Sequence, residues 1–164
     1  MDMKGLYIRN IVFGIADSLV STVGLLAGID ASGSSRSTII LTGIIYAFVE
    51  SLSMAVGSFL SEEAAEQYEQ QRDLNTTGPF IAGCVMFGSF VISSFVPILP
   101  YVLTSTAYAL PLSIGLSLCS LFIVGLVIAM ISKVNLFKHA LKMMLLGGAA
   151  ILIGVAVGKY VHIQ

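Results

Sequence analysis

Charged residues are scarce in this chain, and tryptophan is absent. Lys, Arg, Asp and Glu together make up 10% of its 164 residues, whereas hydrophobic residues make up 57%. Because a soluble domain is about 25% charged, this composition excludes an ordinary soluble protein and indicates a membrane protein. The length suits one compact bundle, which would be a single transmembrane domain. Without tryptophan, any aromatic belt at the membrane surface must consist of tyrosine and phenylalanine.

Other absences exclude several classes of function. The net charge is −1 and there is no basic cluster, so nucleic acid is not an expected partner. Neither a serine–histidine arrangement nor an H-E-x-x-H motif occurs, which makes an intramembrane enzyme the least favoured alternative. No histidine falls in a predicted span, and this weakens the case for a tight Zn²⁺ or Cu²⁺ site. Cys84 and Cys119 lie in apolar runs and are expected to act as small hydrophobic residues.

The apolar runs predict an all-α, polytopic membrane protein with five transmembrane helices. A helix needs ~20 residues to cross ~30 Å of hydrocarbon, and lipid offers no hydrogen-bond partners to an irregular backbone. The stretch between Asp73 and Lys133 contains no charge and is too long for one helix, but its prolines mark a reversal. The predicted spans are about 7–29, 38–60, 79–102, 107–131 and 143–161.

The basic residues predict the orientation of the chain in the membrane. Lys4 and Arg9 lie near the start of the first span, and Lys133, Lys138 and Lys142 lie between the fourth and fifth. With five spans, both groups fall on one side, which the positive-inside rule assigns to the cytoplasm. The N-terminus is therefore expected in the cytoplasm and the C-terminus on the opposite side.

The strongly polar stretch Ser61–Asp73 follows the second span. Its glutamates recur at helical spacing, so most of them share one face, and its alanines favour a helix. The second span is therefore expected to continue into the cytoplasm as an acidic helix over 61–73. Two interpretations stay open for its face: solvated charge, or a surface that captures metal ions for transport. The glutamates are Glu62, Glu63, Glu66 and Glu69.

Asp17 and Glu50 stand near the middle of the first and second spans, and each is the only acid of its span. A charge at bilayer depth costs ~2.5–3.5 kcal/mol by insertion scales, and such residues usually face a bundle interior or an ion path. Both acids belong to stripes of small or polar residues, which permit close contact between these helices or with a symmetry copy. The alternative is a packing seam in which the acids are neutral and hydrogen-bonded. The stripes are Asn10, Gly14, Asp17, Ser21, Gly24 and Gly28, and Gly43, Ala47, Glu50, Met54, Gly57 and Ser61.

Asp17, Glu50 and Met54 together form a plausible ligand set for a transported cation. Carboxylate oxygens suit Mn²⁺ and Fe²⁺, and the softer thioether disfavours Mg²⁺ and Ca²⁺. The depth of the two acids matches the midplane position of many transporter sites. The same carboxyl groups could carry protons that a bound cation displaces. Further candidates for lining the path are Asn10, Ser21 and Tyr46.

The fifth span carries small residues at helical spacing. Gly154 and Gly158 form a G-x-x-x-G motif, and Gly147 precedes it. This motif lets two membrane helices approach closely. It favours a packing seam, within the chain or in a dimer.

These stretches resemble the vacuolar iron transporter family, in particular its prokaryotic members. The first span, IRNIVFGIADSLVSTVGLLAGI, is similar to the family's R-x-x-x-x-G-x-x-D-G-L-V-(S/T) signature. The run ESLSMAVGSFLSEEAAEQYE is similar to the family's A-D-G-L-S-M-A-x-G-x-Y-L-S stretch, and FVPILPY is similar to I-P-L-L-P-F. The resemblance covers nearly the whole chain.

The resemblance implies five-helix protomers that form homodimers and move Fe²⁺, and often Mn²⁺, out of the cytoplasm in exchange for protons. It maps the family's first-span aspartate onto Asp17, its second-span methionine onto Met54 and its second-span aspartate onto Glu50. Ser18 and Ser51 follow the two acids where the family has glycine. The family's glutamate-rich cytoplasmic metal-binding domain is shortened here to about 61–78. The membrane would be the cell membrane of a prokaryote or a vacuole-type membrane of a eukaryote.

The expected partners are the lipid bilayer, a second copy of the chain, a divalent metal ion and protons, with no permanently bound cofactor. The expected function is export of Fe²⁺ or Mn²⁺ from the cytoplasm by exchange with protons. Two rivals stay open. One is a transporter or channel that passes another cation along the same carboxylates, and the other is a non-transporting membrane scaffold whose acids are neutral.

Overall fold

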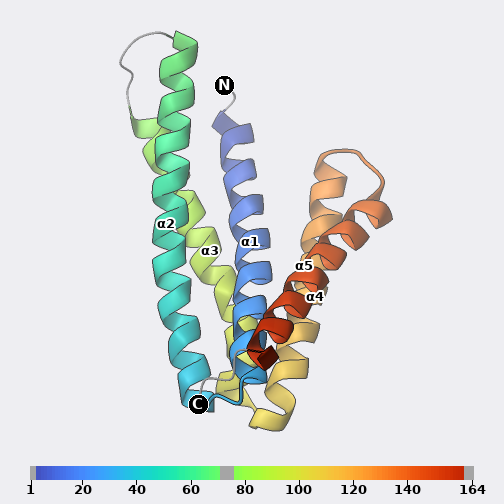
Figure 1. Ribbon diagram of the computed structural model, residues 1–164. Helices are drawn as coiled ribbons and strands as arrows, with labels where there is room; N and C mark the ends of the chain where they lie inside the picture. The colour runs from blue at the N-terminus through green and yellow to red at the C-terminus, as the bar shows by residue number, and fades with distance from the viewer. Residues whose placement is uncertain (1–2, 71–75, 161–164) are drawn as a thin grey trace.

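The computed structural model describes residues 3–70 and 76–160, and every regular element in them is an α-helix. All five helices are long and apolar enough to cross a membrane (Figure 1). The predicted all-α, polytopic fold is confirmed, and the chain is an integral multi-pass membrane protein. The helices are α1 (Met3–Ala31), α2 (Arg36–Gln70), α3 (Thr77–Leu103), α4 (Thr106–Ile131) and α5 (Leu136–Tyr160).

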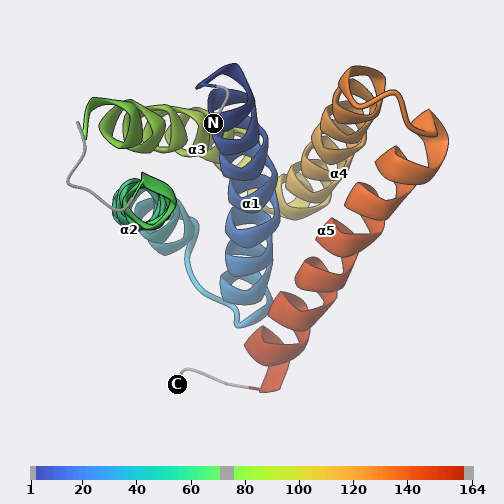
Figure 2. The ribbon, with the colours of Figure 1, turned by 90° about the horizontal axis from the view of Figure 1, so that it is seen from above.

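Helix α1 is the central element of the bundle. It packs against each of the other four helices, whereas α2 packs chiefly on α3, and α4 chiefly on α5. Seen from above, α1 lies between the α2–α3 pair and the α4–α5 pair (Figure 2). The small and polar stripe of α1 is therefore divided among several neighbours and is not one seam with α2.

Glycines bring α1 and α5 into backbone contact. A Cβ atom on Gly28 would lie 2.8 Å from the Gly154 carbonyl oxygen, and one on Gly24 would lie 3.2 Å from the Ala150 carbonyl oxygen. A Cβ atom on Gly158 would overlap the Gly28 carbonyl oxygen. The G-x-x-x-G motif of the fifth span thus packs within the chain, because only glycine allows two backbones this close.

Side-chain hydrogen bonds join three helices at the end of the bundle opposite the start of α1. Arg36 donates from Nε to the Tyr101 carbonyl oxygen at 2.5 Å and from its terminal guanidinium nitrogen to the Val102 carbonyl oxygen at 2.7 Å. The hydroxyl of Tyr101, which is fully buried, donates to Asp30 Oδ2 at 2.9 Å. The turn between α1 and α2 is therefore tied to the C-terminal end of α3.

Helix α2 continues through the acidic stretch without a break as far as Gln70. This agrees with the prediction of an acidic helical extension, although its residues 71–73 lie outside the described part of the chain. Helix α3 begins at Thr77, so the connection from α2 has no room for a multi-helix domain.

Helix α5 begins at Leu136, ahead of the predicted start of the span near Met143. Its first turn is capped, because Asn135 Oδ1 accepts the backbone N–H of Lys138 at 3.1 Å. Lysine is compatible with a helix interior, so the polar residues before the apolar run belong to the helix. Hydrophobicity marks where the apolar run starts, and the cap marks where the helix starts.

Candidate functional site

Predicted path residues meet between α1 and α2. The side chain of Tyr46 lies near that of Ser21, and Ser21 Oγ donates to the Asp17 backbone carbonyl at 2.7 Å. The Asp17 carboxyl group lies within electrostatic range of Glu50. These residues are half-buried in a single chain. Helices α1 and α2 therefore bring their two acids to one level of the bundle.

The register between the two helices explains this level. Ser58 Oγ on α2 donates to Asn10 Oδ1 on α1 at 2.6 Å, and both residues are buried. Asp17 and Glu50 each lie about two helical turns, or ~10–12 Å, from that bond along their own helices. Because the chain reverses direction between α1 and α2, the register that pairs Asn10 with Ser58 also brings the acids together.

The serines that follow the acids are fully buried. Ser18 Oγ donates to the Phe90 carbonyl at 2.9 Å and lies 2.7 Å from Ser94 Oγ, which ties α1 to α3. Ser51 Oγ donates to the Phe48 carbonyl at 2.9 Å within α2. The hydroxyl groups that replace the family's glycines are thus satisfied, as buried polar groups must be in an apolar setting.

Asn10 and Met54 line a cavity of about 500 Å³ between α1, α2 and α3, which we call the Met54 cavity. Asn10 is held there because its Nδ2 donates to the Leu6 carbonyl at 3.0 Å. Met86 of α3 also lines the cavity. Two thioethers therefore share this space with polar side chains.

Asp17 lines a different cavity of about 650 Å³ between α1, α4 and α5, which we call the Asp17 cavity. Met143 of α5 lines it as well. Arg9 and Phe13 line both cavities. The structure therefore places Asp17 and Glu50 at one level of the bundle, within electrostatic range, but Asp17 and Met54 do not line a common cavity of a single chain.

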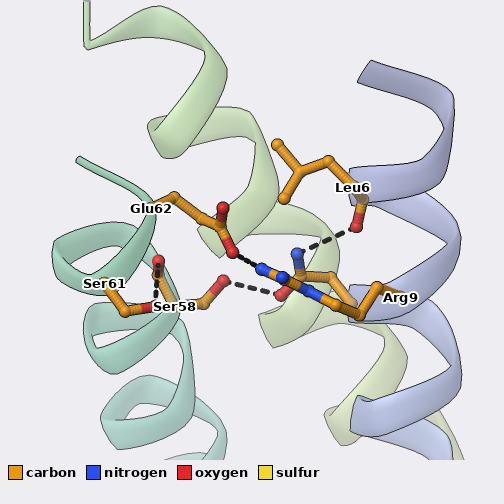
Figure 3. A network of polar contacts seen from close by, with 6 residues as sticks. Leu6, Arg9, Ser58, Ser61 and Glu62 are labelled. Carbon is orange, nitrogen blue, oxygen red and sulfur yellow. Dashed lines mark hydrogen bonds and ion pairs between the residues drawn. The ribbon is translucent and has the colours of Figure 1, made fainter. Parts of the chain in front are cut away.

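The predicted capture residues on α2 differ from one another in environment. Glu62 is buried and forms an ion pair with Arg9 of α1 (Figure 3). Glu63 and Glu66 are half-buried, and Glu69 is exposed. Over residues 3–70 and 76–160, no group of three or more His, Cys, Asp or Glu side chains is placed to hold a metal ion. A capture role for these glutamates stays a prediction.

Sequence reasoning missed three features of this region. Phe13 and Met86 are apolar residues in apolar spans, so no local pattern separates them from ordinary packing residues. From the sequence, Arg9 bears only on the predicted orientation, whereas the structure pairs it with Glu62. Only the register of α1 against α2 reveals that pair.

The sequence profile of the VIT family matches residues 8–77 and 67–159 of the chain. The chain belongs to the vacuolar iron transporter (VIT) family. It is also 29% identical over 154 residues to an uncharacterized protein of Methanocaldococcus jannaschii, in a match that covers 82% of this chain and 80% of that protein. This relative is consistent with a prokaryotic type of VIT protein. Membership in the VIT family indicates transport of metal ions.

Proposed function

We propose that this VIT protein transports a divalent transition metal, Fe²⁺ or Mn²⁺, out of the cytoplasm in exchange for protons. The observation that carries the proposal is that Asp17 on α1 and Glu50 on α2 lie at one level of the bundle, within electrostatic range of each other. Two neighbouring carboxylates in an apolar membrane helix pair are costly. A divalent cation, or protons when the cation is absent, would offset their repulsion.

The Met54 cavity would admit the metal. Its lining includes Arg9 and Asn10, from the first turns of α1. The start of α1 and the α4–α5 turn lie at the same end of the bundle (Figure 1). Lys133, Lys138 and Lys142 belong to that turn and its flanks, so the positive-inside rule supports a cytoplasmic position for this end. The thioether of Met54 would favour Fe²⁺ or Mn²⁺ over Mg²⁺ and Ca²⁺.

From this cavity the metal would pass to Asp17 and Glu50 and displace their protons. Release of the metal on the opposite side would leave both carboxylates open to protons again. Three further side chains would line this route. Asn10 lines the Met54 cavity, Ser21 donates to the Asp17 backbone carbonyl, and Tyr46 lies near both acids. Metal and protons would then move in opposite directions through the same groups.

A homodimer would complete the path. In one chain, Asp17 and Met54 line separate cavities, and Phe13 lines both. Phe13 is 51% exposed. In a two-fold dimer each surface patch meets its own copy. A second chain packed over this side of α1 would cover Phe13 and enclose both cavities between the protomers.

The test is metal uptake by liposomes that contain the purified protein. Entrapped metal-sensitive dyes would report entry of Mn²⁺, Fe²⁺, Mg²⁺ and Ca²⁺ in parallel. The proposal predicts that Mn²⁺ and Fe²⁺ enter about tenfold faster than Mg²⁺ or Ca²⁺, a ratio equivalent to ~1.4 kcal/mol of selectivity. Equal rates for all four ions would favour a less selective cation pathway. No uptake by folded protein would favour the scaffold alternative.

A further inference from the structure

Arg9 and Glu62 form an ion pair (Figure 3), and both residues line the Met54 cavity. The two partners differ sharply in exposure: the Glu62 side chain is 4% exposed, and the Arg9 side chain is 57% exposed. Arg9 can therefore leave the pair without burying its charge. Glu62 cannot leave, and a buried carboxylate without a positive partner is strongly destabilising.

A neighbouring hydrogen bond joins α1 and α2 independently of this ion pair, and a second bond within α1 orients its acceptor. Ser58 donates to Asn10 Oδ1, and Asn10 Nδ2 donates to the Leu6 carbonyl (Figure 3). These groups are buried and uncharged, so they can persist when Arg9 moves. The cavity thus has a fixed polar wall beside an exchangeable positive charge.

The other groups of the cavity suit a metal cation. Met54 and Met86 provide thioethers from α2 and α3, and Ser53 and Ser61 provide hydroxyl groups. The sulfur of Met86 reaches close to α1, because a Cβ atom on Gly14 would lie only 3.1 Å from Met86 Sδ. A carboxylate suits Mn²⁺ and Fe²⁺, and thioethers beside it disfavour the hard ions Mg²⁺ and Ca²⁺.

We propose that the Met54 cavity is a second cation site, in which the Glu62 carboxylate exchanges Arg9 for an incoming divalent transition metal. Arg9 moves into the water at the rim, and Met54 and Met86 contact the metal from two helices. Both states keep Glu62 paired with positive charge. The choice of metal rests on the proposed function, but binding at this site does not require transport.

The experiment measures Mn²⁺ binding to the purified full chain in detergent, from the magnetic-resonance signal of free Mn²⁺. Arg9→Gln removes the charge that competes with the metal for Glu62. Because the metal then no longer has to break a contact to a charged group, we expect Mn²⁺ to bind about tenfold more tightly. Glu62→Gln in the Arg9→Gln background is expected to abolish that gain, and Met86→Leu is expected to weaken binding severalfold. Lys138→Gln is the control, because it removes an exposed positive charge on α5 without touching the cavity.

The sign of the Arg9→Gln effect decides the matter. A folded Arg9→Gln protein whose affinity is unchanged, weakened, or raised no more than in Lys138→Gln overturns the proposal, because Arg9 would then be only a structural partner. Arg9→Lys provides a second variant for the case in which Arg9→Gln does not fold. Lysine keeps the charge but loses the planar fork, so binding should tighten by less, and an unchanged affinity overturns the proposal.

This binding result is separable from the proposed function. If wild-type protein moves no metal in liposomes yet shows the predicted order of affinities, the cavity site stands and the transport proposal fails. If metal uptake is robust while all variants bind Mn²⁺ alike, transport stands and the cavity site fails.

Discussion

Met54 and the acids Asp17 and Glu50 would make different contributions to cation transport. The two carboxylates, which lie within electrostatic range of each other, would supply negative charge that attracts any divalent cation. A thioether supplies soft character, which favours transition metals. Selectivity would then depend on Met54, and the rate for every ion would depend on the acids.

Replacement of Met54 by leucine tests this division. Leucine has nearly the same volume, so the fold should be kept at a cost below ~1.5 kcal/mol. We expect Mn²⁺ uptake by liposomes to fall about tenfold, equivalent to ~1.4 kcal/mol, and Mg²⁺ to become a better competitor. Met130→Leu is the matched control, because Met130 is 67% exposed on α4. An unaltered preference for Mn²⁺ over Mg²⁺ in Met54→Leu would show that the thioether does not determine selectivity.

The sequence allows the acids to be predicted but not their surroundings. Asp17 and Glu50 stand out because each is the only acid of an apolar span. Met86 and Phe13 have no such contrast with their neighbours. The pairing of Arg9 with Glu62 depends on how α1 lies against α2, and no local pattern specifies that register.

At the scale of whole helices, α1 organises the bundle because it contacts all the others. Its glycines serve particular neighbours: Gly14 lies against Met86 and Ser89 of α3, and Gly28 lies against α5. The five helices could be predicted from the apolar runs. The helix that packs against each glycine could not be predicted, because a stripe of small residues permits close packing but does not specify which helix packs there.

A methyl group at the α1–α5 contact is expected to separate these helices. Gly158→Ala would place its Cβ against the Gly28 carbonyl oxygen, and overpacking of this kind costs about 1–3 kcal/mol. The thermal unfolding midpoint in detergent should therefore fall. Gly148→Ala on the same helix is the control, since its Cβ would meet no atom within 4 Å. Equal midpoints for the two variants would mean that the seam tolerates separation.

Arg36 is expected to stabilise the opposite end of α2. Arg36→Gln removes the charge-assisted contacts to the Tyr101 and Val102 carbonyls, each worth about 1.5–3 kcal/mol. We expect a lower unfolding midpoint and faster hydrogen exchange in the last turn of α3. Lys159→Gln, at an exposed position of α5, controls for the loss of charge. Unchanged exchange in α3 would show that these contacts do not hold its end.

In the whole molecule, the two ends of the bundle are built differently. The end with the start of α1 holds the Met54 cavity and an ion pair with one exposed partner. The other end is joined by Arg36, Tyr101 and the glycine contacts of α1 with α5. The first end therefore carries the cavity through which, in the proposed function, metal enters from the cytoplasm.

The proposed dimer predicts that Phe13 lies near its own copy. In a background with Cys84→Ser and Cys119→Ser, Phe13→Cys should form a disulfide-linked dimer when membranes are oxidised. Ile92→Cys is the control, because Ile92 is 74% exposed but lies on α3 and lines neither cavity. Monomeric Phe13→Cys protein, or equal cross-linking at both positions, would place the second chain elsewhere.

The most direct test of the central claim records metal entry and interior pH together in liposomes containing the purified protein. Wild type is compared with Asp17→Asn, with Glu50→Gln and with Ala64→Ser, an exposed control position on α2. We predict Mn²⁺ or Fe²⁺ uptake with opposing proton movement in wild type and Ala64→Ser, and loss of both fluxes in the two acid variants. Metal uptake that persists at the wild-type rate in folded Asp17→Asn and Glu50→Gln would contradict this prediction.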